Sequence, residues 1–284
     1  VLRLGHGPDG HGFDNAFVAI LVVSMLIFLA GLPICYYAAK YGVDIDLLTR
    51  GAGFGYLGST VTSLIYASFT FIFFALEAVI MAKALNLLVG LPLALGYIVS
   101  SIVILPMVFF GITFISRFQL WTQPLWVLLQ LVPLFFILIN DTNLLSEWQL
   151  YQGTKQEGTG VNLLLFGAAA SVMFALVAQI GEQVDFLRFL PEKTAANKVS
   201  WWVGLIVAGP GWIVIGGAKI LIGSFLAVVA MGQGLSSTDA SDPTMMYTVA
   251  FGFVTENTQL ALILAGVFVV VSQLKINVTN VYAG

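Results

Sequence analysis

Apolar stretches of about twenty residues or more recur along this chain, and their length restricts the folds that it can adopt. We expect about seven of them to cross a bilayer as helices. They are residues 16–39, 61–88, 93–116, 120–139, 161–183, 200–231 and 260–284. Barrel strands alternate over about ten residues, and these stretches are longer and do not alternate. The sequence therefore predicts an all-α polytopic membrane protein that is embedded in a lipid bilayer.

The composition agrees with this class. Of 284 residues, 59% are hydrophobic and 9% are charged, whereas about a quarter of the residues in soluble domains are charged. No basic stripe accompanies the net charge of -3, so a nucleic-acid partner is not expected. The single cysteine, Cys35, excludes a disulfide within the chain and is interpreted as a packed apolar residue.

No motif in the chain predicts an enzyme. There is no phosphate-binding loop, and no set of nucleophile, base and acid can be assembled. His6 and His11 stand without cysteines nearby, so a zinc site is not expected. We therefore predict a protein that is not an enzyme and that uses no metal and no cofactor.

Loop charges predict the orientation, because cytoplasmic loops carry an excess of Lys and Arg. The loops on one side hold six basic residues and those on the other side hold three. The six are Lys40, Arg50, Arg117, Arg188, Lys193 and Lys198, and the three are Arg3, Lys83 and Lys155. This places the start of the chain outside and its end inside a cell inner (cytoplasmic) membrane. The chain opens with Val and stops within an apolar stretch, so we expect residues 1–284 to be one transmembrane domain cut from a longer protein.

Three local patterns predict structure outside and within the spans. Asp242 and Pro243 are typical of a helix start, and predict a short surface helix through residue 254. Asp44 and Asp46 near Arg50 are interpreted as a solvated loop. Residues 179–183 combine Gly with amides and an acid, which is typical either of a helix broken to offer backbone groups to a ligand or of plain helix packing.

Glu77 is the sharpest functional candidate, because an ionisable group within an apolar stretch is costly and usually functional. Phe73 lies four residues earlier, and so the ring and the carboxylate share one helix face. A ring can stack on a flat heterocycle while the carboxylate accepts its N–H groups. A structural ion pair with a lysine is the alternative.

Lys275 is the second candidate, since it is the one charge in residues 260–284. It either carries a proton or provides a fixed ammonium where another protein binds sodium. Asn277 and Asn280 nearly share a face near it, which favours either one polar cavity or hydrogen bonds between helices. Lys219 either snorkels or pairs with an acid.

Three segments resemble nucleobase:cation symporters of the purine–cytosine permease type. Residues 38–43 (AAKYGV), 50–55 (RGAGFG) and 58–59 (GS) are similar to the loop after the family's second helix. Residues 185–189 (DFLRF) are similar to the segment after its sixth helix, and residues 273–284 (QLKINVTNVYAG) to its eighth. The resemblance covers family helices two to eight. It implies a leucine-transporter-type bundle of two inverted five-helix repeats, truncated at both ends.

The resemblance also implies roles for individual residues. The family's stacking Trp falls on Phe73, its substrate-binding Gln on Glu77 and its eighth-helix substrate Asn on Asn280. A second stacking aromatic falls near Phe174. A sodium ligand of sodium-driven members falls on Lys275, whose ammonium would repel the ion.

The resulting prediction is a permease (a symporter-type transporter) that moves a nucleobase-like or ureide solute by alternating access, proton-coupled or uncoupled rather than sodium-driven. Gln179 completes the hydrogen bonds to the solute, and Glu77 and Lys275 take part in ion coupling. One alternative is a transporter-like sensor joined to a cytoplasmic signalling domain such as a histidine kinase. A retinal protein, suggested by seven spans with a lysine in the last, lacks the Arg and Asp pair expected in residues 93–116.

Overall fold

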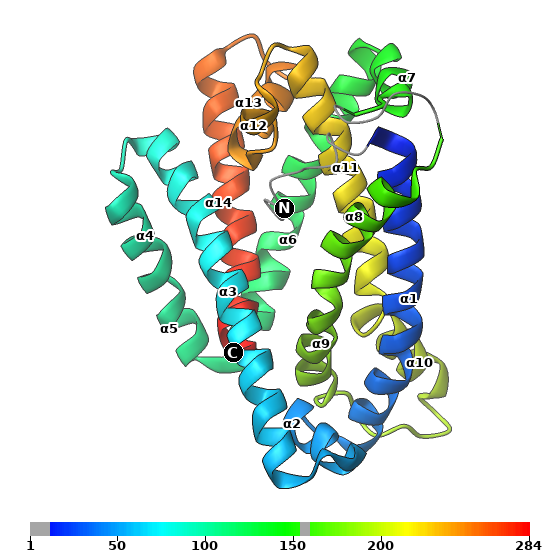
Figure 1. The fold of residues 1–284 in the computed structure, drawn as a ribbon. Coiled ribbons are helices and arrows are strands. Elements are labelled where there is room, and N and C mark those ends of the chain that lie inside the picture. Colours follow the sequence, from blue (N-terminus) through cyan, green and yellow to red (C-terminus); the bar gives the residue numbers. More distant parts are fainter. Residues whose placement is uncertain (1–11, 154–159) are drawn as a thin grey trace. The chain divides into compact units, whose positions relative to one another are not determined.

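The computed structural model describes residues 12–153 and 160–284, and within them it is all-helical, with 85% helix and no strands (Figure 1). His6, His11, Arg3 and Lys155 lie outside the described residues. The elements are α1 (Gly12–Tyr41), α2 (Ile45–Thr49), the π-helical turn η2 (Arg50–Phe54), α3 (Gly55–Val89), α4 (Leu93–Ile102), α5 (Ile104–Phe109), α6 (Gly111–Asn140), α7 (Asn143–Leu150), α8 (Leu163–Phe174), the 3₁₀ turn η3 (Ala175–Ala178), α9 (Gln179–Leu187), α10 (Lys198–Ala208), α11 (Trp212–Gly232), α12 (Ser237–Ala240), α13 (Pro243–Gly252) and α14 (Thr258–Ala283).

Six helical segments among the described residues are long and apolar enough to cross a membrane. They are Gly12–Tyr41, Ile45–Val89, Gly111–Asn140, Leu163–Leu187, Lys198–Gly232 and Thr258–Ala283. The predicted span 93–116 is wrong as a single helix: residues 93–109 form a shorter apolar segment, and residues 111–116 belong to α6. The predicted span 200–231 is two helices, because Pro210 and its flanking glycines lie where α10 ends and α11 begins.

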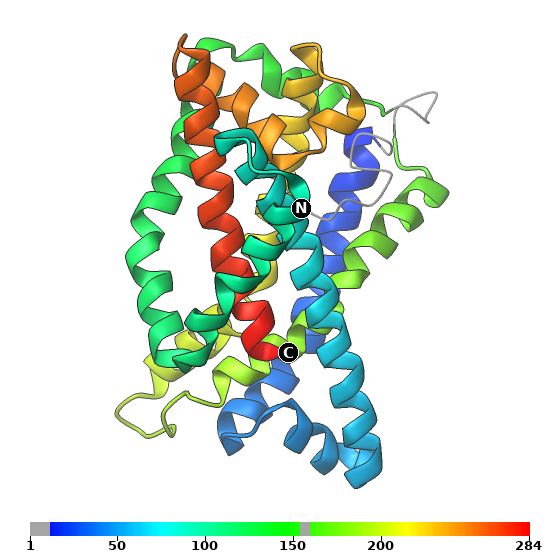
Figure 2. The ribbon, with the colours of Figure 1, turned by 90° about the vertical axis from the view of Figure 1, so that its left-hand side faces the viewer.

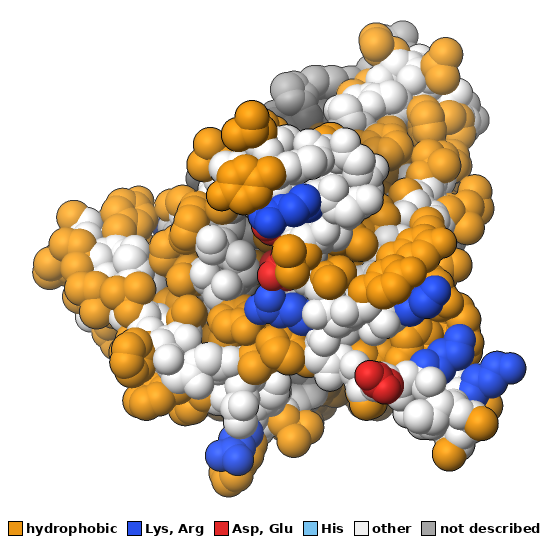
Figure 3. All heavy atoms as spheres, turned by 90° about the horizontal axis from the view of Figure 1, so that it is seen from below, with side chains coloured by type: hydrophobic (Ala, Val, Ile, Leu, Met, Phe, Trp, Pro, Cys, Tyr) orange, Lys and Arg blue, Asp and Glu red, His pale blue; other side chains and the backbone are white. Residues whose placement is uncertain are grey.

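Large apolar side chains cover much of the surface. Leu57, Leu64 and Leu164 are 79%, 68% and 81% exposed, respectively. In the view from below, hydrophobic side chains dominate the visible face and charged ones appear at scattered points (Figure 3). A soluble protein rarely exposes apolar surface on this scale, which agrees with the membrane class predicted from the sequence.

The described chain divides into two compact units, each packed mainly within itself. Unit 1 comprises residues 12–13, 70–153 and 222–282, and unit 2 comprises residues 14–69, 160–221 and 283–284. The core of unit 1 joins the second half of α3 to α6, α11, α13 and α14, with Phe251 and Leu226 each 1% exposed. A smaller core in unit 2 joins α1 to α9 and α10 through Cys35, Leu187 and Leu205.

Helix α13 confirms the start predicted for it but not its place on the surface. Asp242 is the N-cap, and its side chain accepts a hydrogen bond from Thr244 N at 3.0 Å. Met246, Tyr247 and Phe251 are buried in the core of unit 1. Burial raises the pKa of Tyr247 to about 12, so its phenol stays protonated and accepts from Gln130 Nε2 at 2.8 Å.

Close packing of α4 on α3 depends on Gly96. A Cβ atom at this position would lie 2.9 Å from the Cβ and 3.2 Å from the Cα of Ala82. Neither atom can move without the backbone, so we expect Gly96→Ala to lower the free energy of unfolding by about 1–2 kcal/mol despite its better helix propensity.

Gly223→Ala is the matched control in the same unit, since nothing lies within 4 Å of a Cβ there. It should gain up to about 1 kcal/mol. Thermal unfolding of both variants in one detergent tests the pair, and equal melting temperatures for the two would contradict close packing at Gly96.

Candidate functional site

The predicted site residues fall in both units. Phe73, Glu77, Lys275 and Asn280 belong to unit 1, whereas Phe174 and Gln179 belong to residues 160–221 of unit 2. Phe73 and Asn280 are buried and Glu77 is half-buried. The structure therefore brings the predicted α3 residues and the predicted α14 residues into one compact unit.

Within unit 1, one contact defines how α14 lies along α3. A Cβ at Gly266 would come within 2.4 Å of Leu88, so these two residues meet. The helices run in opposite directions (Figure 1). Glu77 lies eleven residues before Leu88, and Asn277 lies eleven residues after Gly266. Eleven residues are about three helical turns, so Glu77 and Asn277 lie at about the same level on the two facing sides.

The side of α14 that faces α3 carries buried amides. Gln273, Asn277 and Asn280 are 7%, 0% and 2% exposed, respectively, and at 3.6 residues per turn they lie within an arc of about 60°. Four of their polar atoms have no hydrogen-bond partner among residues 12–153 and 160–284, namely Gln273 Oε1, Asn277 Oδ1 and Nδ2, and Asn280 Nδ2. A buried polar atom left without a partner costs about 1–3 kcal/mol. A bound ligand or an ordered water molecule would supply the missing hydrogen bonds.

Lys275 lies nine residues after Gly266, about half a turn around α14 from it, and contacts α6. Helix α6 runs beside α14 on the side away from α3 (Figures 1 and 2). The Nζ of Lys275 donates to the carbonyl oxygen of Gln119 at 2.9 Å and to Thr122 Oγ1 at 3.0 Å. Gln119 Nε2 in turn donates to the carbonyl oxygen of Lys275 at 2.7 Å. The ammonium is thus held between oxygens of α6, away from the face that carries Asn280.

Two further polar side chains of α6, beyond Gln119 and Thr122, also form hydrogen bonds to neighbouring helices. Trp126 Nε1 donates to Ser272 Oγ at 2.8 Å, and Gln130 contacts Tyr247 of α13. This row of polar residues on α6 was not predicted from the sequence. Its signal was present, since Gln119, Thr122, Trp126 and Gln130 recur at intervals of three and four residues on α6.

In unit 2, the apolar segment Leu163–Leu187 changes to a 3₁₀ turn just before residues 179–183, for which the sequence left a broken helix and plain packing open. Helix α8 ends at Phe174, the 3₁₀ turn η3 follows, and α9 starts at Gln179. A 3₁₀ stretch within a helix often marks a functional hinge. Phe174, the last residue of α8, is 42% exposed. Helix α9 packs closely on α3, because a Cβ at Gly181 would lie 2.7 Å from the ring of Tyr66.

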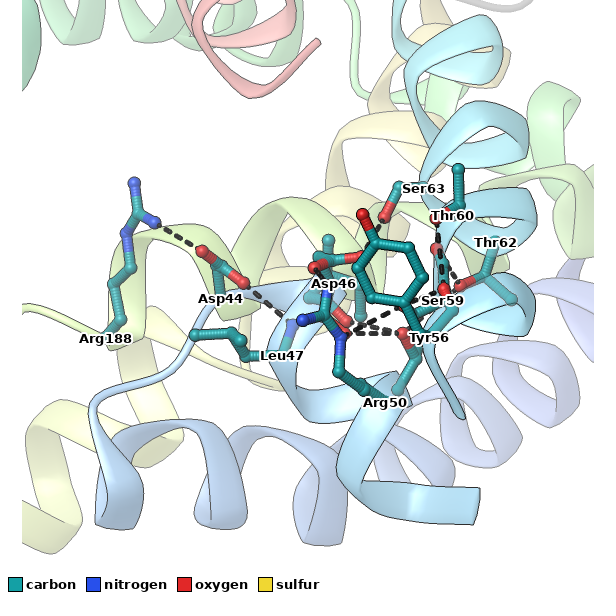
Figure 4. A network of polar contacts seen from close by, with 12 residues as sticks. Asp44, Asp46, Leu47, Arg50, Tyr56, Ser59, Thr60, Thr62, Ser63 and Arg188 are labelled. Atoms are coloured by element: carbon teal, nitrogen blue, oxygen red, sulfur yellow. Dashed lines mark hydrogen bonds and ion pairs between the residues drawn. The ribbon is translucent and has the colours of Figure 1, made fainter. Parts of the chain in front are cut away.

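The sequence had indicated a solvated loop after α1. In the structure, the acidic side chains of this loop form ion pairs and hydrogen bonds instead. Asp46 pairs with Arg50 at 2.6 Å and accepts from Ser63 Oγ at 3.1 Å (Figure 4). Asp44 pairs with Arg188 at 3.2 Å across 144 positions of the chain (Figure 4).

These ion pairs bring two of the three family-like segments together. Ile45 N also donates to Asp185 Oδ1, at 3.5 Å. The loop that holds α2 is therefore fastened both to the end of α9 and to the start of α3.

These features define the class of the protein as a multi-pass helical membrane protein. Among the described residues, no three or more of His, Cys, Asp and Glu are grouped so that they could hold a metal ion. Comparison with family models, curated proteins and solved structures finds no match.

Proposed function

We propose that the protein is a nucleobase-type permease of the inner membrane, with the inverted-repeat bundle that its sequence resembles. The observation that carries this proposal is the 3₁₀ interruption between Phe174 and Gln179 in the apolar segment Leu163–Leu187. A 3₁₀ stretch within a helix often marks a functional hinge, and helices that hinge or break at membrane depth are typical of transporters. Tilting of α8 against α9 at this turn would contribute to alternating access.

The solute-binding groups in unit 1 are proposed to be Phe73, Glu77 and Asn280. Phe73 stacks on a flat, nitrogen-rich ring, and Glu77 accepts its N–H groups. Asn280 adds a donor, because its Nδ2 is buried without a partner among the described residues. Phe174 and Gln179 of unit 2 stay predictions from the resemblance and the helix break.

Thermal stabilisation of the purified protein tests this function. A solute that binds the native state raises the melting temperature in proportion to the logarithm of its concentration over Kd. We expect at least one nucleobase or ureide to stabilise the protein and to enter proteoliposomes that contain it. Failure of the whole panel in both assays would remove the proposal.

Sodium independence is a separate prediction, and it rests on Lys275. The ammonium lies between a helix carbonyl oxygen and a threonine hydroxyl, which are oxygens of the kind that coordinate sodium in transporters. A fixed positive charge there repels the ion.

Uptake of the stabilising solute should therefore change less than about twofold when an inward sodium gradient replaces a potassium gradient of equal size. Proteoliposomes with no gradient provide the baseline. Uptake driven by sodium would show that Lys275 does not take the place of the ion.

A further inference from the structure

Asn277 has no role in the resemblance, yet it is the most deeply buried amide of α14. It is 0% exposed, and neither its Oδ1 nor its Nδ2 finds a partner among the described residues. Asn280 and Gln273 each leave one amide atom without a partner. Asn277 alone therefore offers a donor and an acceptor side by side.

The position of this amide is set by two contacts on opposite sides of α14. Gly266 against Leu88 turns the amide face toward α3, and Lys275 against Gln119 holds the opposite face on α6. Rotating α14 to hide the amide would break both contacts. The backbone thus keeps Asn277 at the level of Glu77 and prevents it from turning toward α6 for partners.

We propose that Asn277, together with Gln273, forms a solute-binding site that pairs with an N–H group and a C=O group adjacent on one edge of the solute. Asn277 Oδ1 accepts the N–H and Nδ2 donates to the C=O, as in a pair of amides. Gln273 Oε1 accepts a further N–H. This inference rests on the proposed function and names the part of the site that selects among nitrogen-rich solutes.

The selection follows from counting donors and acceptors. An amidine-like cation offers N–H donors to Glu77 but no carbonyl oxygen to Asn277 Nδ2 or Asn280 Nδ2. A buried amide left half-paired rejects such a ligand strongly. The site therefore prefers a solute such as cytosine or uracil to benzamidine, although the carboxylate of Glu77 alone would favour the cation.

The test compares Asn277→Leu with Gln130→Leu in the purified protein, using thermal shift with cytosine, uracil and benzamidine. Gln130 is the matched control because it is a buried amide of unit 1 that has a partner, Tyr247. Asn277→Leu should melt no lower than the wild type without solute, and should bind cytosine or uracil at least about tenfold more weakly. Gln130→Leu should melt lower and keep the wild-type response to solute.

Asn277→Asp gives a second readout, because it replaces the donor by an acceptor at nearly constant volume. The preference for the nucleobase over benzamidine should fall at least about tenfold, or reverse. If wild type responds to nucleobases while both Asn277 variants respond equally well, the inference is wrong and the permease function stands. If wild type responds to no nucleobase and no ureide in thermal shift or in uptake, both fall together.

Discussion

Replacing Glu77 by Gln is expected to weaken binding of a donor-rich solute about 10- to 150-fold, the equivalent of about 1.5–3 kcal/mol for a hydrogen bond to a charged group. The carboxylate only accepts hydrogen bonds, whereas the amide of Gln presents one accepting and one donating end. An N–H group that met an oxygen would then meet another N–H group. A solute that offers a carbonyl oxygen to position 77 should lose less, or gain.

The measurement is the solute-dependent rise in melting temperature of Glu77→Gln, each variant being compared with its own solute-free state. Glu147→Gln is the matched control, since Glu147 is an exposed acid on α7 of the same unit and loses the same charge. Equal responses from the two variants and wild type would show that Glu77 is a structural acid and not a binding group.

The helical class was predictable because a bilayer imposes length and apolarity on every span. Six of the predicted spans correspond to helical segments that are long and apolar enough to cross. The remaining predicted span, 93–116, is not one helix, because Gly111 separates α5 from α6 inside an uninterrupted apolar stretch. Gly111 has a φ of 72°. Hydropathy has no signal for a bend between two equally apolar helices. Pro210 was such a signal for the break between α10 and α11, and it was outweighed by the length of the stretch.

The site was only partly predictable, because sequence spacing gives the face of a helix but not its neighbour. Spacing placed Phe73 with Glu77 and Asn277 with Asn280. It could not show that Lys275 turns to α6 or that Asn277 lies at the level of Glu77, since both depend on how α14 packs. The burial of α13 was hidden for the same reason: its cap and its proline specify a helix start but no packing partner.

Removing the carboxylate of Asp242 should destabilise unit 1 by about 2–4 kcal/mol, the largest stability effect that we predict. One oxygen caps α13, and the other accepts from Lys83 Nζ at 2.6 Å. The side chains of Lys83 and Asp242 are only 28% and 11% exposed, respectively, so water screens this pair less than a surface pair. Asp242→Ala loses the cap and leaves the ammonium of Lys83 without this partner.

Two further variants separate these contributions. Asp242→Asn keeps an oxygen that can cap α13 and loses only the charge, so it should be less destabilising than Asp242→Ala by about 1 kcal/mol. Lys83→Met removes the ammonium, and once Met is present at position 83, Asp242→Asn should cost little more. Thermal and denaturant unfolding of the single and double variants give the coupling, and Asp239→Asn, at an exposed position on α12, is the control. If Asp242→Ala unfolds like the wild type, the prediction is wrong. The apolar side chains Met246, Tyr247 and Phe251 would then be enough to hold α13 in unit 1.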